Sequence, residues 1–221
     1  MGTPRSAKGR AKVVAELLAE QFPGTARDLC ELDHNSPFQL LAATILSAQT
    51  TDKRVNEVTP VLFARYLTPA DLAGAVPEEL EEIVHSTGFY RNKAKSLIGM
   101  ARALVERFDG EVPSAMEDLV TVPGTGRKTA NVVRSVAMNQ PGLPVDTHVL
   151  RLSKRLGLVA EVLGDDAVKV EHALGALIVP SERGVFSLRV ILHGRRVCDA
   201  RKPKCGECVL AGVCPSAGSF V

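Results

Sequence analysis

The stretch that decides the fold of this chain is Leu119-Val120-Thr121-Val122-Pro123-Gly124-Thr125-Gly126-Arg127-Lys128-Thr129-Ala130. A capped segment beginning at Ser114 precedes it, and apolar residues at helical spacing follow it as far as Ala137. A Pro-Gly-x-Gly turn between two helices predicts a helix–hairpin–helix. The glycines allow positive φ and leave backbone N–H groups uncovered, and the second helix adds its positive dipole end. The stretch therefore predicts a site for a phosphate group, and its single residue between glycines excludes a Walker A loop.

Helix signals recur along the rest of the chain. Ser36-Pro37-Phe38-Gln39 has the form of a capping box with proline at the first helical position. We expect further N-caps at Asp52, Thr68, Ser114, Asp146 and Ser181. Two-residue alternation of apolar and polar side chains is scarce, so the sequence predicts an all-α protein of about ten short helices.

Composition narrows the function classes. The 221 residues are 45% hydrophobic and 24% charged, as in ordinary globular proteins. No apolar run approaches the roughly 20 residues of a membrane span, and the N-terminus lacks a signal-peptide core. We therefore expect no membrane partner and a cytoplasmic location. The net charge is only +2, but six of seven charged residues between Pro123 and Arg155 are basic, as are six of seven from Arg189 to Lys204. This unevenness favours a face that meets a polyanion.

Four of the five cysteines lie close together, in the pattern Cys198-x6-Cys205-x2-Cys208-x5-Cys214. Four thiolates in one loop predict a metal site, which could hold zinc or a 4Fe–4S cluster. Only Cys205 and Cys208 form a zinc-knuckle pair, and the wider gaps favour iron–sulfur. The first gap contains Arg201, Lys202 and Lys204. A loop held by metal ligands at both ends would present these cations to a phosphate at little entropic cost.

Lys128 and Asp146 are the candidate catalytic residues. Lys128 falls in the first turn of the second hairpin helix, where the helix dipole and Arg127 both disfavour a charged amine. The sequence leaves two roles equally open for it, nucleophile or phosphate ligand. Asp146 is the only acid in its basic stretch, and it could cap a helix, stabilise a positively charged sugar, or do both.

Three signatures together resemble the endonuclease III family of the helix–hairpin–helix glycosylase superfamily. They are Leu46-Ser47-Ala48-Gln49-Thr50-Thr51-Asp52, the hairpin with Lys128 followed by Val145-Asp146-Thr147-His148, and Ile191-Leu192-His193-Gly194 before the cysteine loop. The resemblance runs from about Leu17 to Cys214. It implies base-excision repair: a DNA glycosylase that removes oxidised or damaged pyrimidines from duplex DNA and nicks abasic sites by β-elimination through a lysine Schiff base. A monomer is expected.

The resemblance also implies roles for single residues. Lys128 would be the nucleophile and Asp146 the catalytic aspartate. Gln49 would fill the gap left by a flipped nucleotide, and Phe89 would be the apolar wedge, a position that is commonly leucine in the family. Gly124, Gly126, Arg127 and Thr129 would bind DNA with the hairpin. The ligands of one 4Fe–4S cluster would be Cys198, Cys205, Cys208 and Cys214.

Two helical domains with a DNA-binding cleft between them are implied by the same resemblance. Residues 30–140 would form a six-helix domain carrying the hairpin, and residues 1–29 with 141–221 would form the iron–sulfur domain. The alternatives are a glycosylase specific for uracil, thymine or adenine mismatches, or a non-enzymatic helix–hairpin–helix DNA-binding protein. Mismatch glycosylases tend to lack a lysine at position 128, and plain phosphate binding needs no isolated acid such as Asp146.

Overall fold

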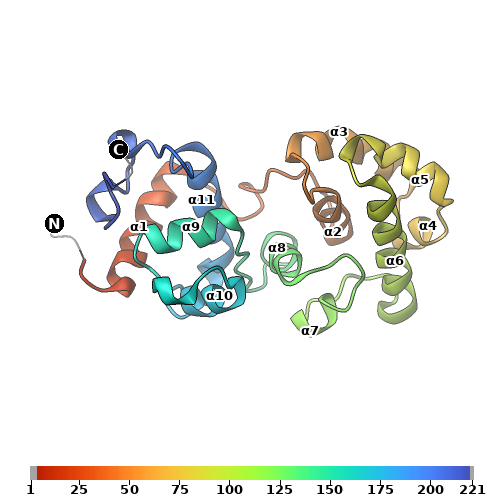
Figure 1. The fold of residues 1–221 in the computed structure, drawn as a ribbon. Helices are drawn as coiled ribbons and strands as arrows, with labels where there is room; N and C mark the ends of the chain where they lie inside the picture. Colours follow the sequence, from red (N-terminus) through yellow and green to blue (C-terminus); the bar gives the residue numbers. More distant parts are fainter. Residues whose placement is uncertain (1–3, 220–221) are drawn as a thin grey trace. The chain divides into compact units, whose positions relative to one another are not determined.

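The computed structural model describes residues 4–219, and within them all regular secondary structure is helical, with no strand. The chain folds into two compact units. We call Cys30–Gln140 the central unit, and Met1–Leu29 together with Pro141–Val221 the terminal unit. Figure 1 shows the helices of each unit in the colours of their sequence position. The all-α prediction is confirmed.

The central unit is built around its most apolar helix. Its elements are α2 (Pro37–Leu46), α3 (Asp52–Arg65), α4 (Pro69–Ala73), α5 (Pro77–Val84), the 3-10 turn η1 (His85–Thr87), α6 (Tyr90–Phe108), α7 (Met116–Leu119) and α8 (Arg127–Ala137). Helix α2 packs on α3, α6 and α8, and its Leu40, Leu41 and Leu46 are fully buried. Burying each such side chain stabilises the unit by about 1.5–3 kcal/mol. Helix α2 therefore joins the hairpin before α8 to the loop that carries Gln49.

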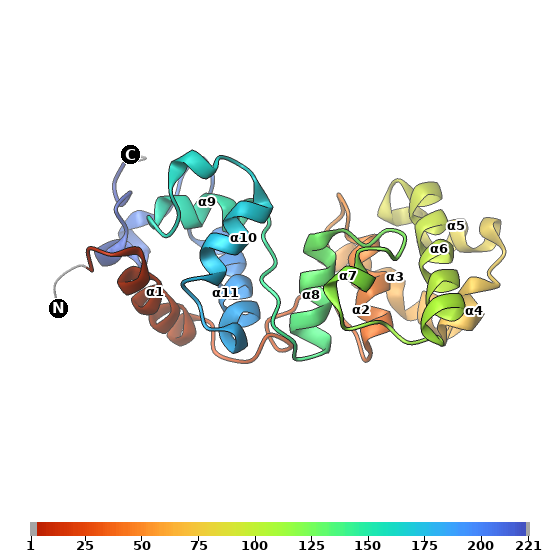
Figure 2. The ribbon, with the colours of Figure 1, turned by 90° about the horizontal axis from the view of Figure 1, so that it is seen from below.

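The terminal unit packs helix α1 against the C-terminal part of the described chain. It contains α1 (Ala7–Gln21), α9 (Thr147–Arg155), η2 (Glu161–Leu163), α10 (Ala167–Gly175), η3 (Pro180–Glu182), α11 (Arg183–Arg196), η4 (Cys205–Glu207) and η5 (Ala211–Val213). Helix α11 packs on both α1 and α9, and Figure 2 shows α1 beside α11. Through these contacts α11 fixes the start of the cysteine loop.

The helix starts agree only in part with the predicted caps. The Ser36, Thr68 and Asp146 side chains cap α2, α4 and α9 as predicted. The other predictions are wrong. The caps preceding α3 and α7 are Thr51 and Ala115, one residue from the predicted Asp52 and Ser114, and Ser181 lies inside η3. The Gln39 side chain accepts from Asn35 N at 2.8 Å, so the predicted box closes one residue early. At α3 the neighbouring Thr51 hydroxyl accepts from Arg54 N in place of Asp52, whereas α7 begins without any side-chain cap.

No helix in the described part of the chain is both long enough and apolar enough to cross a membrane.

Candidate active site and iron–sulfur site

The hairpin of the central unit has two glycines in different surroundings. Gly124 has φ 79°, and a Cβ placed on it would lie 3.1 Å from Ile45 Cδ1 and 3.1 Å from Ser96 Cβ. Gly126 has φ −83°, and a Cβ on it would meet no atom within 4 Å among the described residues. The turn closes through a bond from Thr125 N to Val122 O of 3.0 Å. Gly124 is therefore required by the fold, whereas Gly126 leaves its backbone open to an outside group.

Helix α8 begins directly at this open backbone. Its N-cap is Gly126, and no side chain in the described residues caps it. Lys128, at the second position of the helix, is exposed, and its amine makes no hydrogen bond or ion pair with any described residue. Arg127 and Thr129 on either side are half-buried. A free amine beside uncapped amide groups is suited to a phosphate or to a sugar next to one.

Gln49 and Phe89 are both exposed and both have left-handed backbone. Their φ angles are 55° and 48°, and Phe89 is 64% exposed. Left-handed backbone costs an L-residue about 1–2 kcal/mol, and for a bulky residue it is an outlier that often marks a functional position. Asp109 and Asn139 share this backbone conformation among the described residues, so the angle supports the predicted roles of Gln49 and Phe89 only together with their exposure.

Asp146 precedes α9 in the terminal unit, and its carboxylate caps that helix. Its Oδ1 accepts from His148 N at 2.8 Å and from Val149 N at 2.9 Å. Both bonds use the same oxygen, so the cap does not occupy Oδ2. The capping role and a catalytic role for Asp146 are therefore compatible. The neighbouring His148 is half-buried, and burial lowers its pKa below the ordinary value.

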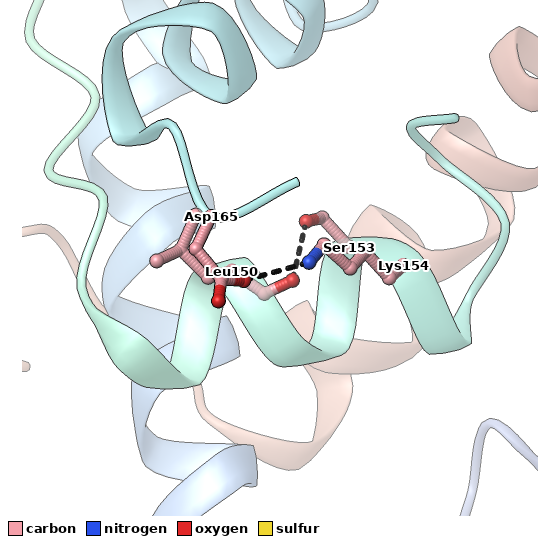
Figure 3. A network of polar contacts seen from close by, with 4 residues as sticks. All are labelled: Leu150, Ser153, Lys154 and Asp165. Carbon is pink, nitrogen blue, oxygen red and sulfur yellow. Dashed lines mark hydrogen bonds and ion pairs between the residues drawn. The ribbon is translucent and has the colours of Figure 1, made fainter. Parts of the chain in front are cut away.

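The cations of α9 are largely engaged inside the terminal unit. Arg151 donates to Gly194 O at 3.1 Å and to Cys198 O at 2.9 Å. Arg155 donates to the backbone oxygens of Asp199 and Ala200 at 2.8 and 2.7 Å. Lys154 pairs with Asp165 at 2.8 Å, beside the bond from Ser153 to Leu150, as Figure 3 shows. The basic stretch that suggested a polyanion partner thus contains three cations that hold the protein's own loops.

The four clustered cysteines line one cavity, together with apolar side chains that include Leu152, Leu156 and Leu210. Burial raises the pKa of the Cys208 and Cys214 thiols, and neighbouring cysteine thiols of the cluster raise both further. Among the described residues no three His, Cys, Asp or Glu side chains form a group that could hold a single metal ion. Four sulfurs around an apolar cavity match an iron–sulfur cluster in number and chemistry.

Polar groups of α9 and α11 contact these sulfurs. Arg155 Nη1 lies 3.2 Å from Cys198 Sγ, and His193 Nε2 lies 3.3 Å from Cys208 Sγ. His193 is 1% exposed, and burial lowers its pKa to about 4, so the ring is neutral near neutral pH with one N–H. The other ring nitrogen, Nδ1, lies 2.8 Å from Gln21 Oε1, so the side chain of Gln21 and the Cys208 sulfur both contact this ring. Such contacts orient sulfur ligands and tune a metal centre.

The loop between the first two cysteines carries the predicted phosphate contacts. Arg201 and Lys202 are exposed and make no bond or ion pair within the described chain. Lys204 is also exposed, but its amine donates to Arg196 O at 3.2 Å. Arg155 holds the start of the loop through two carbonyls, and two of the loop's three cations are free to face solvent.

Comparison with known proteins connects these features. The profile of the HhH-GPD superfamily base excision DNA repair protein matches residues 42–180, and that of the iron–sulfur binding domain of endonuclease III matches residues 198–214. Endonuclease III from Synechocystis sp. is 53% identical over 213 residues, which cover 96% of this chain and 94% of the relative. Endonuclease III from Escherichia coli is 38% identical over 200 residues, covering 90% and 93%.

The chain belongs to the endonuclease III family.

Solved structures of the family agree with this assignment. A trapped endonuclease III–DNA covalent intermediate superposes with a TM-score of 0.87 at 42% identity and covers 96% of this chain and 97% of its own. A non-covalent endonuclease III–DNA complex gives the same TM-score at 41% identity. As a family member, the chain is a base-excision repair DNA glycosylase with AP lyase activity and carries one 4Fe–4S cluster. The predictions of family, activity and cofactor are confirmed.

Sequence reasoning missed one group in the central unit, Lys93. It is 5% exposed, and its amine is bonded to Thr87 O and Thr50 Oγ1. A signal for it was present, because Lys93 lies four residues before Leu97 on the stripe that continues to Ala101 and Leu104. A lysine on the buried stripe of a helix is unusual enough to be noticed.

Proposed function

We propose that this glycosylase removes damaged pyrimidines with Lys128 as its nucleophile and Asp146 as its catalytic carboxylate. The observation that carries the proposal is the exposed amine of Lys128, which has no partner in the described chain and stands in the uncapped first turn of α8.

In the proposed reaction the neutral Lys128 amine attacks C1′ of the damaged nucleotide. The new N–C1′ bond forms as the glycosidic bond breaks, and the base leaves with the bonding electrons and takes up a proton. Asp146 stabilises the positive charge that develops on the sugar. The attacking nitrogen loses a proton, and the C1′–O4′ bond then breaks while O4′ takes up a proton, which gives an open-chain protonated Schiff base. The Schiff base acidifies the C2′ proton, and transfer of that proton to a base expels the 3′ phosphate by β-elimination.

Contacts to duplex DNA come from both units in this proposal. Backbone groups at Gly124 and Gly126, with Arg127 and Thr129, bind a phosphate of the damaged strand. Gln49 and Phe89 enter the stack when the damaged nucleotide is flipped out. Arg201, Lys202 and Lys204 bind phosphates from the cysteine loop.

The cysteine loop depends on the cluster for its shape. In this proposal the cluster would be held by the sulfurs of Cys198, Cys205, Cys208 and Cys214. The bound cluster would supply a rigid cross-link between distant parts of the loop. Arg155 and His193 contact two of these sulfurs and fix their orientation. We further propose that the protein works as a monomer in the cytoplasm, at the nucleoid if the source is bacterial, because its substrate is duplex DNA.

Borohydride trapping tests the proposal. The purified, cluster-loaded protein is mixed with a duplex holding one thymine glycol, and borohydride reduces any Schiff base to a stable covalent adduct. We expect an adduct with the wild type and with Lys95→Gln, whose lysine is exposed on α6, but not with Lys128→Gln. An adduct with Lys128→Gln would place the nucleophile elsewhere. Base release by the wild type without an adduct would make the enzyme monofunctional. If the wild type gives no adduct and releases no base, the mismatch-glycosylase or binding-protein alternative would be favoured.

A further inference from the structure

A buried lysine joins the two loops that carry Gln49 and Phe89. Lys93 lies in the first turns of α6, and only 5% of it is exposed. Its Nζ donates to Thr87 O at 2.7 Å and to Thr50 Oγ1 at 3.3 Å. Thr50 directly follows Gln49, and Thr87 precedes Phe89 by two residues. One amine therefore bonds to both loops within a few bonds of the side chains that are proposed to enter DNA.

The two loops also bond to each other at the same point. The Thr50 hydroxyl donates to the Thr87 carbonyl, which thus accepts hydrogen bonds from the Gln49 loop and from α6. Thr87 is 1% exposed, and its own hydroxyl donates to Val84 O at 2.7 Å. Lys93 and Thr87 are buried and Thr50 is half-buried, and the hydrogen bonds among the three can hold the loops at a fixed separation.

The backbone beside this junction needs support. Gln49 and Phe89 both have positive φ, at 55° and 48°, and Gly88 between the junction and Phe89 has φ 70°. Non-glycine residues keep such angles only where the surroundings impose them. The side chains of Gln49 and Phe89 are exposed and do not supply that support themselves. The contacts of Thr50, Thr87 and Lys93 lie where support is needed.

A lysine is a costly choice for this position if stability is its only purpose. No carboxylate is bonded to its amine within the described chain, and burial lowers its pKa. An unbranched apolar side chain of similar length would fill the space without burying a charge. The Thr87 carbonyl would keep the Thr50 hydroxyl as a donor. What only the amine provides is a link from α6 to both loops at once.

We propose that Lys93 is a positioning residue that holds the Gln49 and Phe89 loops in register, so that both side chains enter the duplex together when a damaged nucleotide is flipped. The inference rests on the proposed function for the roles of Gln49 and Phe89. It assigns to Lys93 no contact with DNA and no part in the chemistry at Lys128.

The test compares Lys93→Met with Lys95→Met, a matched change at an exposed lysine of the same helix. Single-turnover excision of dihydrouracil paired with adenine requires extrusion of a stacked base, whereas cleavage of a preformed abasic site has no base to extrude. We expect Lys93→Met to slow excision by about 10- to 100-fold, as misplaced groups do. Abasic-site cleavage, cluster content and melting temperature should change much less, and Lys95→Met should behave as wild type.

A double-mutant cycle separates this role from a general structural one. If Lys93 acts through the Gln49 loop, Lys93→Met should add little to the defect of Gln49→Ala, because coupled residues are not additive. The fluorescence of 2-aminopurine placed opposite an abasic site should report weaker insertion by Lys93→Met. If the protein with Lys93→Met fails to fold, Thr50→Val, which removes the bridging hydroxyl, provides the same comparison.

Each outcome decides one of the two proposals. Wild-type excision by both Gln49→Ala and Phe89→Ala would overturn their proposed roles, and the Lys93 inference with them. Defects in those two variants with normal excision by Lys93→Met, or by Thr50→Val as its substitute, would overturn the Lys93 inference alone. Full additivity of Lys93→Met with Gln49→Ala would also overturn it, since Lys93 would then act elsewhere.

Discussion

Replacing each hairpin glycine by alanine should distinguish the glycine that is required for folding from the glycine that is required for DNA binding. At Gly124 the new Cβ would sit on left-handed backbone with φ 79° and 3.1 Å from both Ile45 Cδ1 and Ser96 Cβ. The Ile45 methyl can rotate away, but Ser96 Cβ is fixed to α6. Left-handed backbone costs about 1–2 kcal/mol and overpacking about 1–3 kcal/mol, so Gly124→Ala should lower the free energy of unfolding by about 2–5 kcal/mol.

At Gly126 the same change should leave stability nearly unaltered. Its φ of −83° suits any residue, and the added Cβ meets no described atom within 4 Å. We expect the free energy of unfolding to change by less than about 0.5 kcal/mol. The methyl group would, however, stand where a phosphate must approach the amides of α8. Loss of one charge-assisted hydrogen bond, worth about 1.5–3 kcal/mol, would weaken DNA binding about 10- to 100-fold.

Two measurements check this pair. Urea unfolding of the cluster-loaded proteins gives the change in stability, and fluorescence anisotropy with a labelled duplex at fixed salt gives the change in affinity. A Gly124→Ala protein as stable as the wild type would refute the packing argument. Unchanged DNA affinity in Gly126→Ala would refute the assignment of the open backbone to phosphate binding.

Three further predictions concern the terminal unit. Asp146→Asn should keep the cap and the melting temperature, since asparagine caps as well as aspartate, but it should lose most base excision. Asp146→Ala should in addition lower the free energy of unfolding in urea by about 1 kcal/mol. Full excision by Asp146→Asn would show that the charge of Asp146 is not used. Gly194→Ala should destabilise the protein by about 1–3 kcal/mol, because the added Cβ would lie 2.8 Å from Nδ1 and 2.9 Å from Cβ of His148. Gly175→Ala, whose Cβ comes no closer than 3.5 Å to Arg183, is the control in the same denaturation assay, and equal stability of the two variants would contradict the clash. Arg155→Met should retain less iron and acid-labile sulfide after dialysis than wild type, because the Arg155 guanidinium contacts Cys198 Sγ and two loop carbonyls. An iron content equal to that of the wild type would show that the cysteines hold the loop unaided.

Most of what could be predicted from the sequence was local. Turn glycines, capping residues and helical spacing predicted an all-α chain with a hairpin before α8, because each of these signals acts within a few residues. Cap positions failed by one residue at Asp52, where the adjacent Thr51 hydroxyl caps the helix instead, and at Ser114, where the helix begins after Ala115 without a side-chain cap. The cysteine spacing predicted a metal loop, and the identity of its cofactor was decided by family resemblance.

Charge was the least dependable signal. The basic residues of α9 suggested a surface for a polyanion, but Arg151 and Arg155 bind carbonyls of the cysteine loop, and Lys154 pairs with Asp165. A charge count along the chain cannot distinguish a cation that faces solvent from one that turns inward. That choice depends on which carbonyl oxygens the folded chain leaves without a donor.

The sequence by itself determined the helices, the hairpin, the cysteine loop and the family of this protein, since these follow from neighbouring residues or from whole motifs. Only the tertiary structure decided that Gly124 is packed against α2 and α6 while Gly126 is open, and that Asp146 caps α9 through one oxygen. It also placed the amine of Lys93 between the loops of Gln49 and Phe89. The surroundings of Gly124 and the bonds of Lys93 join residues that are distant along the chain, and only packing of the folded backbone brings such residues within contact.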